Sequence, residues 1–367
     1  MPGGTQREVD VLGRAPGGGM GRPTLADVAA AAGVSPSTAS LAFSGAGPVA
    51  AATRERVMAA AAQLGYTGPN PIARSLRRGQ SGVVGVITGR HLSRSFRDPV
   101  SVQTLDGIAD ALGARDLGML LIPFDDAAPG VPQLVAHAAM DAAIMIATPA
   151  PGDRALRTLL ARDVPTVTLD SRHRGTASVR IADRAGMRDL ASEVVALGHT
   201  RIAVLTLPFA PGRGTGELDP DHLPRPTYTP TRNRLAGVRD AGIRPVAVVE
   251  AGASLVEEGF EAARRLLARD PRPTAIIAFS DLLAAGVVLA ARELGLDVPG
   301  DLTVTGFDGV DLPWLAPDVL ASAMQPFVHK GTLAAEAAAA LIAGEDVRTP
   351  DLTVVPRPGT TTGPPPH

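Results

Sequence analysis

Small hydroxyl side chains cluster near the amino terminus, within the segment PTLADVAAAAGVSPSTASLAFSG. Thr24 can cap one helix with Asp27 at its third position, and Ser35 can cap a second helix that starts at Pro36. Gly33 supplies the tight turn between them. Two short helices that meet at a glycine, with small polar residues opening the second, predict a helix-turn-helix. The diameter of its second helix fits the major groove of DNA.

A third helix is expected after this pair, from about Thr53 to Leu64, with Val57 and Ala60 on its apolar face. The same three helices also fit a plain helical bundle with no DNA role. The spacing alone leaves that alternative open.

The charge of the chain is uneven. Residues 1–80 contain eight Arg and four acidic residues, so their net charge is +4, and the other 287 residues carry the −6 that brings the total to −2. A small basic head on an acidic body indicates a polyanion partner for the head. A solvated basic face is the alternative explanation.

The composition of the 367 residues excludes several classes of protein. With no cysteine, disulfides, thiolate metal sites and cysteine nucleophiles are ruled out. No apolar stretch reaches the ~18 residues of a membrane span, and no secretory signal pattern opens the chain. The hydrolase and nucleotide-binding motifs G-x-S-x-G, H-E-x-x-H and Walker A are missing, and the seven His show no metal spacing. We therefore expect a soluble cytoplasmic protein with no catalytic residue, cofactor or metal.

From Ser81 onward, continuous apolar runs alternate with helical patterns. This alternation is typical of parallel sheets that helices cover on both faces. Roughly ten such strands exceed one comfortable sheet, so two doubly wound units are expected. In such folds ligands lie beyond the carboxyl ends of the strands, and two adjacent units create a cleft.

Several motifs together resemble the lactose-repressor (LacI/GalR) family of bacterial transcription regulators. They are TLADVAAAAGVSPSTAS, TRERVMAAAAQLGY, PNPIARSL and SGVVGVI, with weaker similarity in ALGHTRIAVL, RNRLAGVRDAG and AIIAFSDLLAAGVVLAARELGLDVPGDLTVTGFDG. The resemblance implies a small all-α DNA-binding head and an α/β core of two doubly wound lobes like a periplasmic binding protein. It also implies a homodimer under allosteric control by a small ligand.

The resemblance sets the expected domain boundaries. A disordered tail over residues 1–21 precedes the helix-turn-helix domain at 22–67 and a hinge at 68–80. The first core lobe is expected at 81–182 and 308–325, and the second at 183–307 and 326–356. A second disordered tail is expected at 357–367.

The resemblance also implies the residues that contact DNA. Hydroxyls at five positions match phosphate contacts, which fix the register without reading the sequence. Pro36, Ser37 and Leu41 match the positions that contact bases. Leu41 departs from the family pattern, because the family usually has Arg or Lys at this position. Ala50 replaces the usual hydroxyl cap of the third helix. The expected contacts in the head are Thr24, Leu25, Ser35, Pro36, Ser37, Thr38, Ser40, Leu41, Ser44, Thr53 and Tyr66.

The hinge segment GPNPIARSLRRGQ can form a short helix with Asn70 as its cap. So few residues do not persist as an isolated helix in water, so we expect folding on DNA. The family helix pairs with its dimer mate in the minor groove, where a leucine at the place of Leu76 wedges between base pairs. A flexible linker is the alternative. The expected hinge contacts are Asn70, Ala73, Arg74 and Leu76.

In the core, the resemblance implies a ligand site with Arg234 and Asp281 facing each other across a cleft. A guanidinium and a carboxylate in that arrangement suit a polyol such as a sugar. Asp98 and Asp170, which follow predicted strands, are further candidates. Asp308 is expected to be structural, and Trp314 fits either core packing or ligand stacking.

The sequence therefore predicts a repressor whose affinity for double-stranded operator DNA responds to a small effector, a sugar. The alternative is an intracellular solute-binding protein of the same core fold that binds no DNA, and an enzyme on a doubly wound fold is a third. The effector, the operator sequence, the sign of regulation and the choice between dimer and tetramer stay open.

Overall fold

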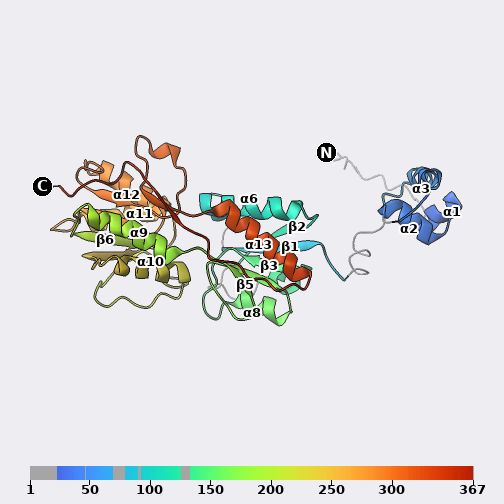
Figure 1. Ribbon diagram of the computed structural model, residues 1–367, viewed down its shortest axis with the longest axis horizontal. Helices are drawn as coiled ribbons and strands as arrows, with labels where there is room; N and C mark the ends of the chain where they lie inside the picture. The colour runs from blue at the N-terminus through green and yellow to red at the C-terminus, as the bar shows by residue number, and fades with distance from the viewer. Residues whose placement is uncertain (1–22, 46, 69–78, 90–91, 125–132, 367) are drawn as a thin grey trace, which may run out of the picture. The chain divides into compact units, whose positions relative to one another are not determined.

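The computed structural model describes residues 23–45, 47–68, 79–89, 92–124 and 133–366 (Figure 1). The chain divides into two compact units, Met1–Gln80 and Ser81–His367. The tail expected over residues 1–21 stays a prediction because it lies outside the described residues. The same holds for the four hinge residues Asn70, Ala73, Arg74 and Leu76.

Three helices form the first unit: α1 (Leu25–Ala32), α2 (Pro36–Ser44) and α3 (Ala51–Leu64). The capping box that opens α1 is confirmed, because the Thr24 amide donates to Asp27 Oδ2 (2.8 Å) and the Asp27 amide donates to Thr24 Oγ1 (3.3 Å). Gly33 ends α1 at φ 65°, a left-handed conformation that glycine adopts without strain. The helices share a core of Val28, Ala29, Ala39, Ala42, Val57, Ala60 and Ala61.

The start of α3 shows the effect of a missing cap. The helix begins at Ala51, two residues before the predicted start, and Ala50 at its N-cap offers no side-chain hydrogen bond. An alanine in place of a capping hydroxyl costs about 1 kcal/mol of helix stability. The missing cap is therefore seen in the structure, and the looser start of α3 stays a prediction.

Five parallel strands form the sheet of the first lobe, in the order β2–β1–β3–β4–β5. They are β1 (Val83–Thr88), β2 (Gly118–Pro123), β3 (Ala142–Met145), β4 (Thr166–Leu169) and β5 (Ala177–Val179). Helices α6 and α13 pack on one face, and α7 and α8 on the other. The helices of this lobe are α5 (Leu92–Ser95), α6 (Pro99–Gly113), α7 (Gln133–His137), α8 (Arg154–Ala161) and α13 (Phe327–Ile342).

The second lobe repeats this plan with the strand order β10–β9–β6–β8–β7, in which only β7 is antiparallel among the described strands. The strands are β6 (Ile202–Thr206), β7 (Gly216–Leu218), β8 (Ala247–Glu250), β9 (Ala275–Ala278) and β10 (Thr303–Thr305). Helices α9 and α10 cover one face, and α11 and α12 the other. They span Asp183–Ala196, Thr229–Asp240, Val256–Leu267 and Asp281–Glu293 in that order. The predicted pair of doubly wound lobes is confirmed.

The chain passes between the lobes three times, and two expected boundaries are wrong. Helix α13 packs against α6 and against β3 and β4 of the first lobe, beside α6 in Figure 1. Residues 308–325 stay with the second lobe, because Thr305 and Asp308 form bridges with Ala321 and Met324. The expected assignment of 308–325 to the first lobe and of 326–356 to the second was therefore reversed. Apolar periodicity predicts a helix but not the sheet to which it returns.

The tail expected over residues 357–367 is ordered as far as residue 366, so that prediction was also wrong. Strand β12 (Val355–Arg357) pairs antiparallel with β11 (Ser322–Met324), which follows the 3-10 helix η1 (Pro313–Leu315). Thr361 is fully buried, donates to the Val304 carbonyl (2.7 Å) and accepts from the Ala321 amide (3.0 Å). The buried His199 ring lies 2.8 Å from the Gly363 carbonyl oxygen through Nε2, so this histidine holds the terminal segment to the second lobe.

The long segment 208–230 belongs to the second lobe. Its strand β7 extends the sheet beside β8, and the Thr227 amide donates to the Phe209 carbonyl (2.7 Å). Within the described part of the chain, every helix is too short or too polar to cross a membrane.

Candidate DNA-reading helix and ligand site

The amino terminus of α2 presents a group of linked hydroxyls. Ser35 Oγ accepts from the Thr38 amide (3.1 Å) and lies 2.9 Å from Ser37 Oγ and 2.8 Å from Thr38 Oγ1. Amide donors at a helix start and neighbouring hydroxyls are suited to phosphate oxygens. The local sequence thus builds a surface with the chemistry of a backbone contact.

The remaining head positions divide by exposure. Six of the expected DNA contacts are exposed: Thr24, Ser35, Pro36, Ser37, Leu41 and Ser44. Five are half-buried: Leu25, Thr38, Ser40, Thr53 and Tyr66. The Tyr66 ring meets Phe43 edge-on, with centroids 5.4 Å apart, so it also holds α2 to the end of α3.

Leu41 stands where the family usually has Arg or Lys, and the structure shows how its side chain is exposed. Its side chain is 39% exposed on a helix, PSTASLAFS, that carries no charged residue. A Cβ added at Gly47 would lie 3.0 Å from Leu41 Cδ2, so the loop after α2 supports this leucine from one side. An apolar contact such as a thymine methyl is the base chemistry available to it.

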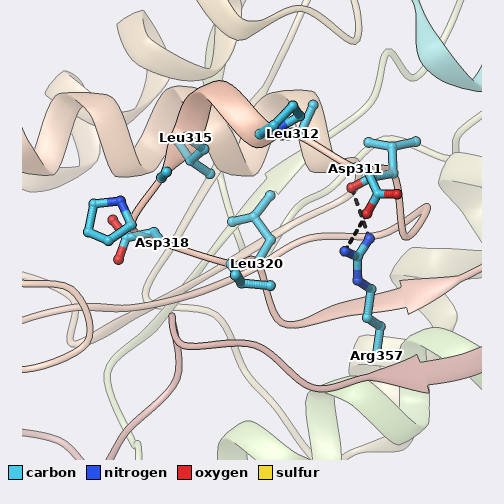
Figure 2. A pocket seen from close by; sticks show the side chains of 11 residues that line it. Asp311, Leu312, Leu315, Asp318, Leu320 and Arg357 are labelled. Atoms are coloured by element: carbon cyan, nitrogen blue, oxygen red, sulfur yellow. Dashed lines mark hydrogen bonds and ion pairs between the residues drawn. The ribbon is translucent and has the colours of Figure 1, made fainter.

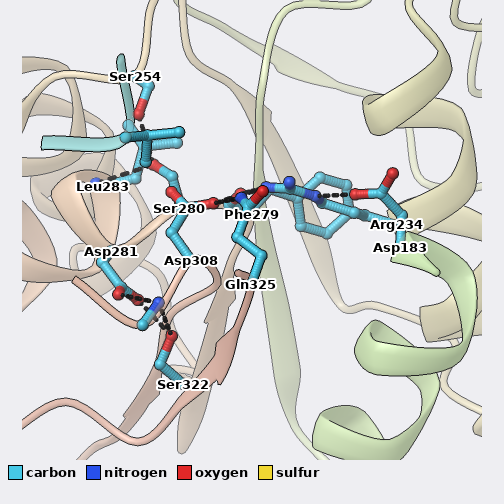
Figure 3. A network of polar contacts seen from close by, with 12 residues as sticks. Asp183, Arg234, Ser254, Phe279, Ser280, Asp281, Leu283, Asp308, Ser322 and Gln325 are labelled. Atoms are coloured by element: carbon cyan, nitrogen blue, oxygen red, sulfur yellow. Dashed lines mark hydrogen bonds and ion pairs between the residues drawn. The ribbon is translucent and has the colours of Figure 1, made fainter. Parts of the chain in front are cut away.

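In the core, Arg234 is held on every side by buried groups. Its Nε donates to Asp183 Oδ1 (2.9 Å), and Nη1 donates to the Phe279 carbonyl and lies 3.5 Å from Asp308 Oδ1. Its Cζ sits 3.7 Å from the centroid of the Phe307 ring. Figure 3 shows Arg234 between Asp183 and Asp308. The fixed plane leaves Arg234 one geometry in which to meet a ligand.

A chain of polar contacts continues from Arg234 into the first lobe. Asp308 Oδ1 accepts from Gln325 Nε2 (2.7 Å), and Gln325 Oε1 accepts from Lys330 Nζ (2.9 Å). Lys330 Nζ also donates to Asp170 Oδ2 (3.0 Å). Lys330 is on α13 and Asp170 directly follows β4, whereas Arg234 is on α10 of the second lobe. We call Asp183, Arg234, Asp308, Gln325, Lys330 and Asp170 the inter-lobe network.

Two aspartates of this network have unusual backbones. Asp170 has φ 57° and Asp308 has φ 131°, in the region that L-residues rarely adopt. Such strain persists where surrounding contacts hold it, and it concentrates at ligand-binding sites. Asp170 Oδ1 is moreover buried with no hydrogen-bond partner among the described residues.

Asp98 caps α6 and lies near the network. Its carboxylate accepts from the Val100 amide (3.2 Å) and the Ser101 amide (3.3 Å), and from the Ser101 hydroxyl (2.7 Å). Burial raises its pKa, while these hydrogen bonds and the Lys330 charge oppose the rise. Its electrostatic interactions with Lys330 and Asp308 make it a neighbour of the ligand candidates.

Asp281 departs from the expected arrangement. Its carboxylate accepts from the Ser322 hydroxyl (2.6 Å) and from the Gly309 and Val310 amides (2.7 and 2.8 Å). It is the first residue of α12, whose cap is Ser280, and no ion pair joins it to Arg234 in the described structure. In Figure 3 it lies with Ser322, away from the Arg234–Asp183 pair. The carboxylates that face Arg234 are Asp183 and Asp308, and Asp281 fastens the segment that carries Asp308.

Burial shapes the protonation of the network. It raises the pKa of Asp183 to about 6 against the attraction of Arg234. Burial likewise raises the pKa of Asp308 well above its usual range, opposed by Arg234 and reinforced by Asp281 and Asp98. Hydrogen-bonding carboxyl groups that gain or lose a proton near neutral pH are common at functional sites.

The structure thus brings three of the four expected ligand residues, Arg234, Asp170 and Asp98, into one region with Asp308 and Lys330. Asp281 does not bond to Arg234 in the described structure, but its charge acts on Asp308, and its role as a ligand contact stays a prediction. Sequence reasoning did not single out Asp308 or Lys330 as ligand residues. Asp308 stood in the TGFDG motif directly after a predicted strand, the position where ligands bind. Lys330 was visible as the only lysine of the chain. Trp314 is 52% exposed, so core packing does not explain it.

A separate cavity of about 410 Å³ lies on the second lobe, lined by residues 310–313, 315–320 and Arg357 (Figure 2). Its walls are largely aliphatic, with Leu312, Leu315 and Leu320 pointing into it. Arg357 closes one side through Asp311 (2.6 Å). This cavity contains none of the network residues. In the described residues, no group of His, Asp or Glu is arranged to hold a metal ion.

Comparisons with known proteins agree with this geometry. Residues 24–70 match the family of bacterial regulatory proteins called lacI, and residues 191–362 match a periplasmic binding protein-like domain. An HTH-type transcriptional regulator of Mycobacterium tuberculosis is 36% identical over 86% of this chain and 90% of its own length. The HTH-type transcriptional regulator IpsA of Corynebacterium glutamicum is 33% identical over 93% and 98%.

A solved structure agrees as well. The lac repressor dimer bound to operator and the anti-inducer ONPF superposes with a TM-score of 0.77 at 27% identity, over 94% of this chain and 100% of that chain. The head, the two lobes and the sequence similarity over most of the chain lead to one conclusion: the chain belongs to the lacI family of bacterial regulatory proteins and is a DNA-binding transcriptional regulator.

Proposed function

We propose that the chain is a homodimeric, cytoplasmic repressor whose affinity for operator DNA is set by a small polyol, a sugar, bound at the inter-lobe network. The observation that carries this proposal is the polar chain from Arg234 through Asp308, Gln325 and Lys330 to Asp170, because it connects both lobes. A ligand that inserts among these groups contacts both lobes at once.

The chemistry of the network supports a polyol. Carboxylates accept hydrogen bonds from hydroxyls, and a planar guanidinium donates to two oxygens at once. Phe307 provides an aromatic face, although Arg234 already stacks on it. A site with alternating donors and acceptors discriminates strongly for a ligand whose hydroxyls match them, since unmatched buried groups are costly.

The link to DNA follows from a two-state argument. A ligand changes the equilibrium between lobe arrangements only as far as it binds one arrangement better. In a dimer, a change of lobe angle alters the spacing of the two hinge segments, so DNA affinity changes by a coupling of ~1–3 kcal/mol. The lac repressor structure, which holds both operator and anti-inducer as a dimer, supports this scheme.

The test begins with DNA sequences selected by the full-length protein from a random duplex library. Binding is then measured by fluorescence anisotropy with and without a panel of sugars and polyols. We expect a steep loss of affinity with salt and a change of roughly 5–150-fold with one effector. Absence of DNA binding at low salt would instead favour a solute-binding protein without a DNA role.

Repression is tested by placing the selected site between a promoter and a reporter gene. A repressor lowers reporter output when it is expressed, and the effector changes that output. Output that rises on expression of the protein would identify an activator and overturn this part of the proposal.

A further inference from the structure

The inter-lobe network and its neighbour Asp98 contain more acidic than basic groups. Among the described residues, four carboxyl groups stand beside two cations: Asp98, Asp170, Asp183 and Asp308 beside Arg234 and Lys330. Burial raises the pKa of Asp98, Asp183 and Asp308, so these three hold a negative charge less readily than exposed carboxyl groups do. Electrostatic interactions connect Lys330 with Asp98 and Asp183, and Asp98 with Asp308, so these groups share one region.

Both cations are already engaged by the protein. Lys330 is 3% exposed, and its Nζ donates to Asp170 (3.0 Å) and to Gln325 (2.9 Å). Arg234 uses Nε on Asp183 (2.9 Å) and Nη1 on the Phe279 carbonyl. An anionic ligand therefore competes with buried carboxyl groups for both cations.

The unmet hydrogen-bonding capacity belongs to an acceptor. Asp170 Oδ1 is buried and has no partner in the described structure. A carboxylate oxygen accepts but does not donate while it is ionised. A hydroxyl or an ammonium group of a ligand satisfies it, whereas a phosphate or carboxylate oxygen repels it.

Building on the proposed function, we propose that the inter-lobe network selects a hydroxyl-rich effector without negative charge and rejects phosphorylated or carboxylated derivatives of it. Asp170 and Lys330 are the residues that set this selection. Asp170 supplies the open acceptor, and Lys330 neutralises its other oxygen and so limits the acidic excess. We call this selection against negative charge the charge filter. It distinguishes a free sugar or polyol from its phosphorylated or carboxylated derivative.

The test uses the full-length chain and matched ligands. Glucose, ribose and other neutral sugars and polyols are each compared with a phosphate ester, and glucose also with glucuronate and glucosamine. Melting temperatures identify the ligands that bind, and calorimetry then gives each Kd. We expect the neutral form, and the amine where it fits, to bind roughly tenfold or more tightly than the anionic form.

Two variants in the network shift this selectivity in opposite directions. Asp170→Asn keeps the shape and tolerates the left-handed backbone, and it removes one negative charge. It should lower the ratio of anionic to neutral Kd by about tenfold. Lys330→Met removes a positive charge at similar length and should raise that ratio. A purely structural role would lower both affinities and leave their ratio unchanged.

The control is Asp163→Asn. Asp163 is exposed and has φ 55°, close to that of Asp170, but it precedes β4 and lies outside the network. It should leave the ratio unchanged.

The outcomes separate the two proposals. Anionic forms that bind the wild type as tightly as neutral forms, or tighter, overturn the charge filter and leave the proposed effector site intact. An unchanged ratio in folded Asp170→Asn and Lys330→Met proteins also overturns it. If neither series shifts the melting temperature or the DNA affinity, the proposed control by a polyol itself fails.

Discussion

At the scale of single residues, Leu41 gives the recognition helix its character. It is exposed on a helix without charge, at a position where the family resemblance implies a base contact. We therefore expect sequence discrimination in this head to depend on apolar and hydroxyl contacts. We also expect overall affinity to depend on phosphate contacts to a larger extent than in a helix that carries an arginine.

Replacing Leu41 by Arg should change the selected DNA sequence. The guanidinium can form paired hydrogen bonds with a guanine, worth ~1–3 kcal/mol of discrimination at one base pair. Sequencing of DNA selected from a random library should show a new guanine preference at one position of each half-site. Met58→Arg on α3, where Met58 is 48% exposed, adds the same charge elsewhere on the head and should not create that preference.

Asp183 should make stability depend on pH in a defined direction. Its pKa of about 6 in the folded protein exceeds the ~3.9 of an unfolded chain, so the folded state holds an extra proton between these values. The contribution to the free energy of unfolding is full below pH ~4 and is lost as the pH rises to about 6, by at most about 3 kcal/mol.

Calorimetric melting from pH 4.5 to 7.5 checks this. As the pH rises, wild type should lose stability relative to Asp183→Asn, although the variant is less stable overall because Arg234 lacks its partner. Asp163→Asn serves as the exposed control. If the melting temperatures of wild type and Asp183→Asn changed equally with pH over this range, the expected effect of burial on the pKa of Asp183 would be contradicted.

The sequence predicted part of this site and missed the rest for a physical reason. Arg234 stands out because it matches the family arginine in RNRLAGVRDAG, and Asp170 because it lies at the end of a predicted strand. Asp308 and Lys330 become important only when three distant segments meet between the lobes. Asp281 looked equivalent to a ligand residue, but its carboxylate is taken up by Ser322 and two backbone amides, a contact over 28 to 41 residues that no local pattern reveals.

At the scale of elements, the contact between α6 and α13 positions Lys330. A Cβ on Gly107 would lie 2.0 Å from the Val328 carbonyl oxygen, and one on Gly331 would lie 2.1 Å from the Thr104 carbonyl oxygen. The two helices thus approach each other at a pair of glycines. Gly331 is adjacent to Lys330, so this packing fixes where the lysine enters the network.

Gly107→Ala should therefore destabilise the core by about 1–3 kcal/mol, because α13 must move away. It should also weaken ligand binding through the displaced Lys330. Gly113→Ala is the matched control in the same helix, since a Cβ there meets nothing within 4 Å. That variant should be neutral or more stable by up to about 1 kcal/mol. Urea unfolding of both proteins distinguishes packing from helix propensity.

The elements themselves were well predicted. Apolar runs such as SGVVGVIT and AIIAFS became buried parallel strands, because both of their faces are covered by helices. The return of α13 to the first lobe was not predictable, because its alanine-rich apolar stripe fits either sheet. The glycine pair that decides this pairing is evident only once both helices are in place.

At the scale of the whole molecule, the carboxyl-terminal segment stabilises the second lobe. Deletion of residues 358–367 removes the buried Thr361 and the Gly363 carbonyl that His199 contacts. We expect a lower melting temperature, with a loss of about 1–3 kcal/mol for each buried polar group left unpaired. Deletion of residues 1–21 is the control and should leave the melting temperature of the core unchanged.

The hinge prediction also concerns the whole molecule. Leu76→Ala should abolish most specific operator binding because the apolar wedge is lost, while effector binding to the core persists. Anisotropy with selected DNA and calorimetry with the effector measure the two activities separately. Unchanged DNA binding would contradict the wedge and favour a flexible linker.

The order in which the chain visits its lobes has a consequence for synthesis. Helix α13, one wall of the first lobe, is encoded after the entire sheet of the second lobe. A nascent chain that has emerged as far as β5 still exposes the apolar face that α13 later covers. The first lobe therefore stays incomplete until nearly all of the polypeptide has left the ribosome, so termination before α13 leaves one apolar face of its sheet uncovered.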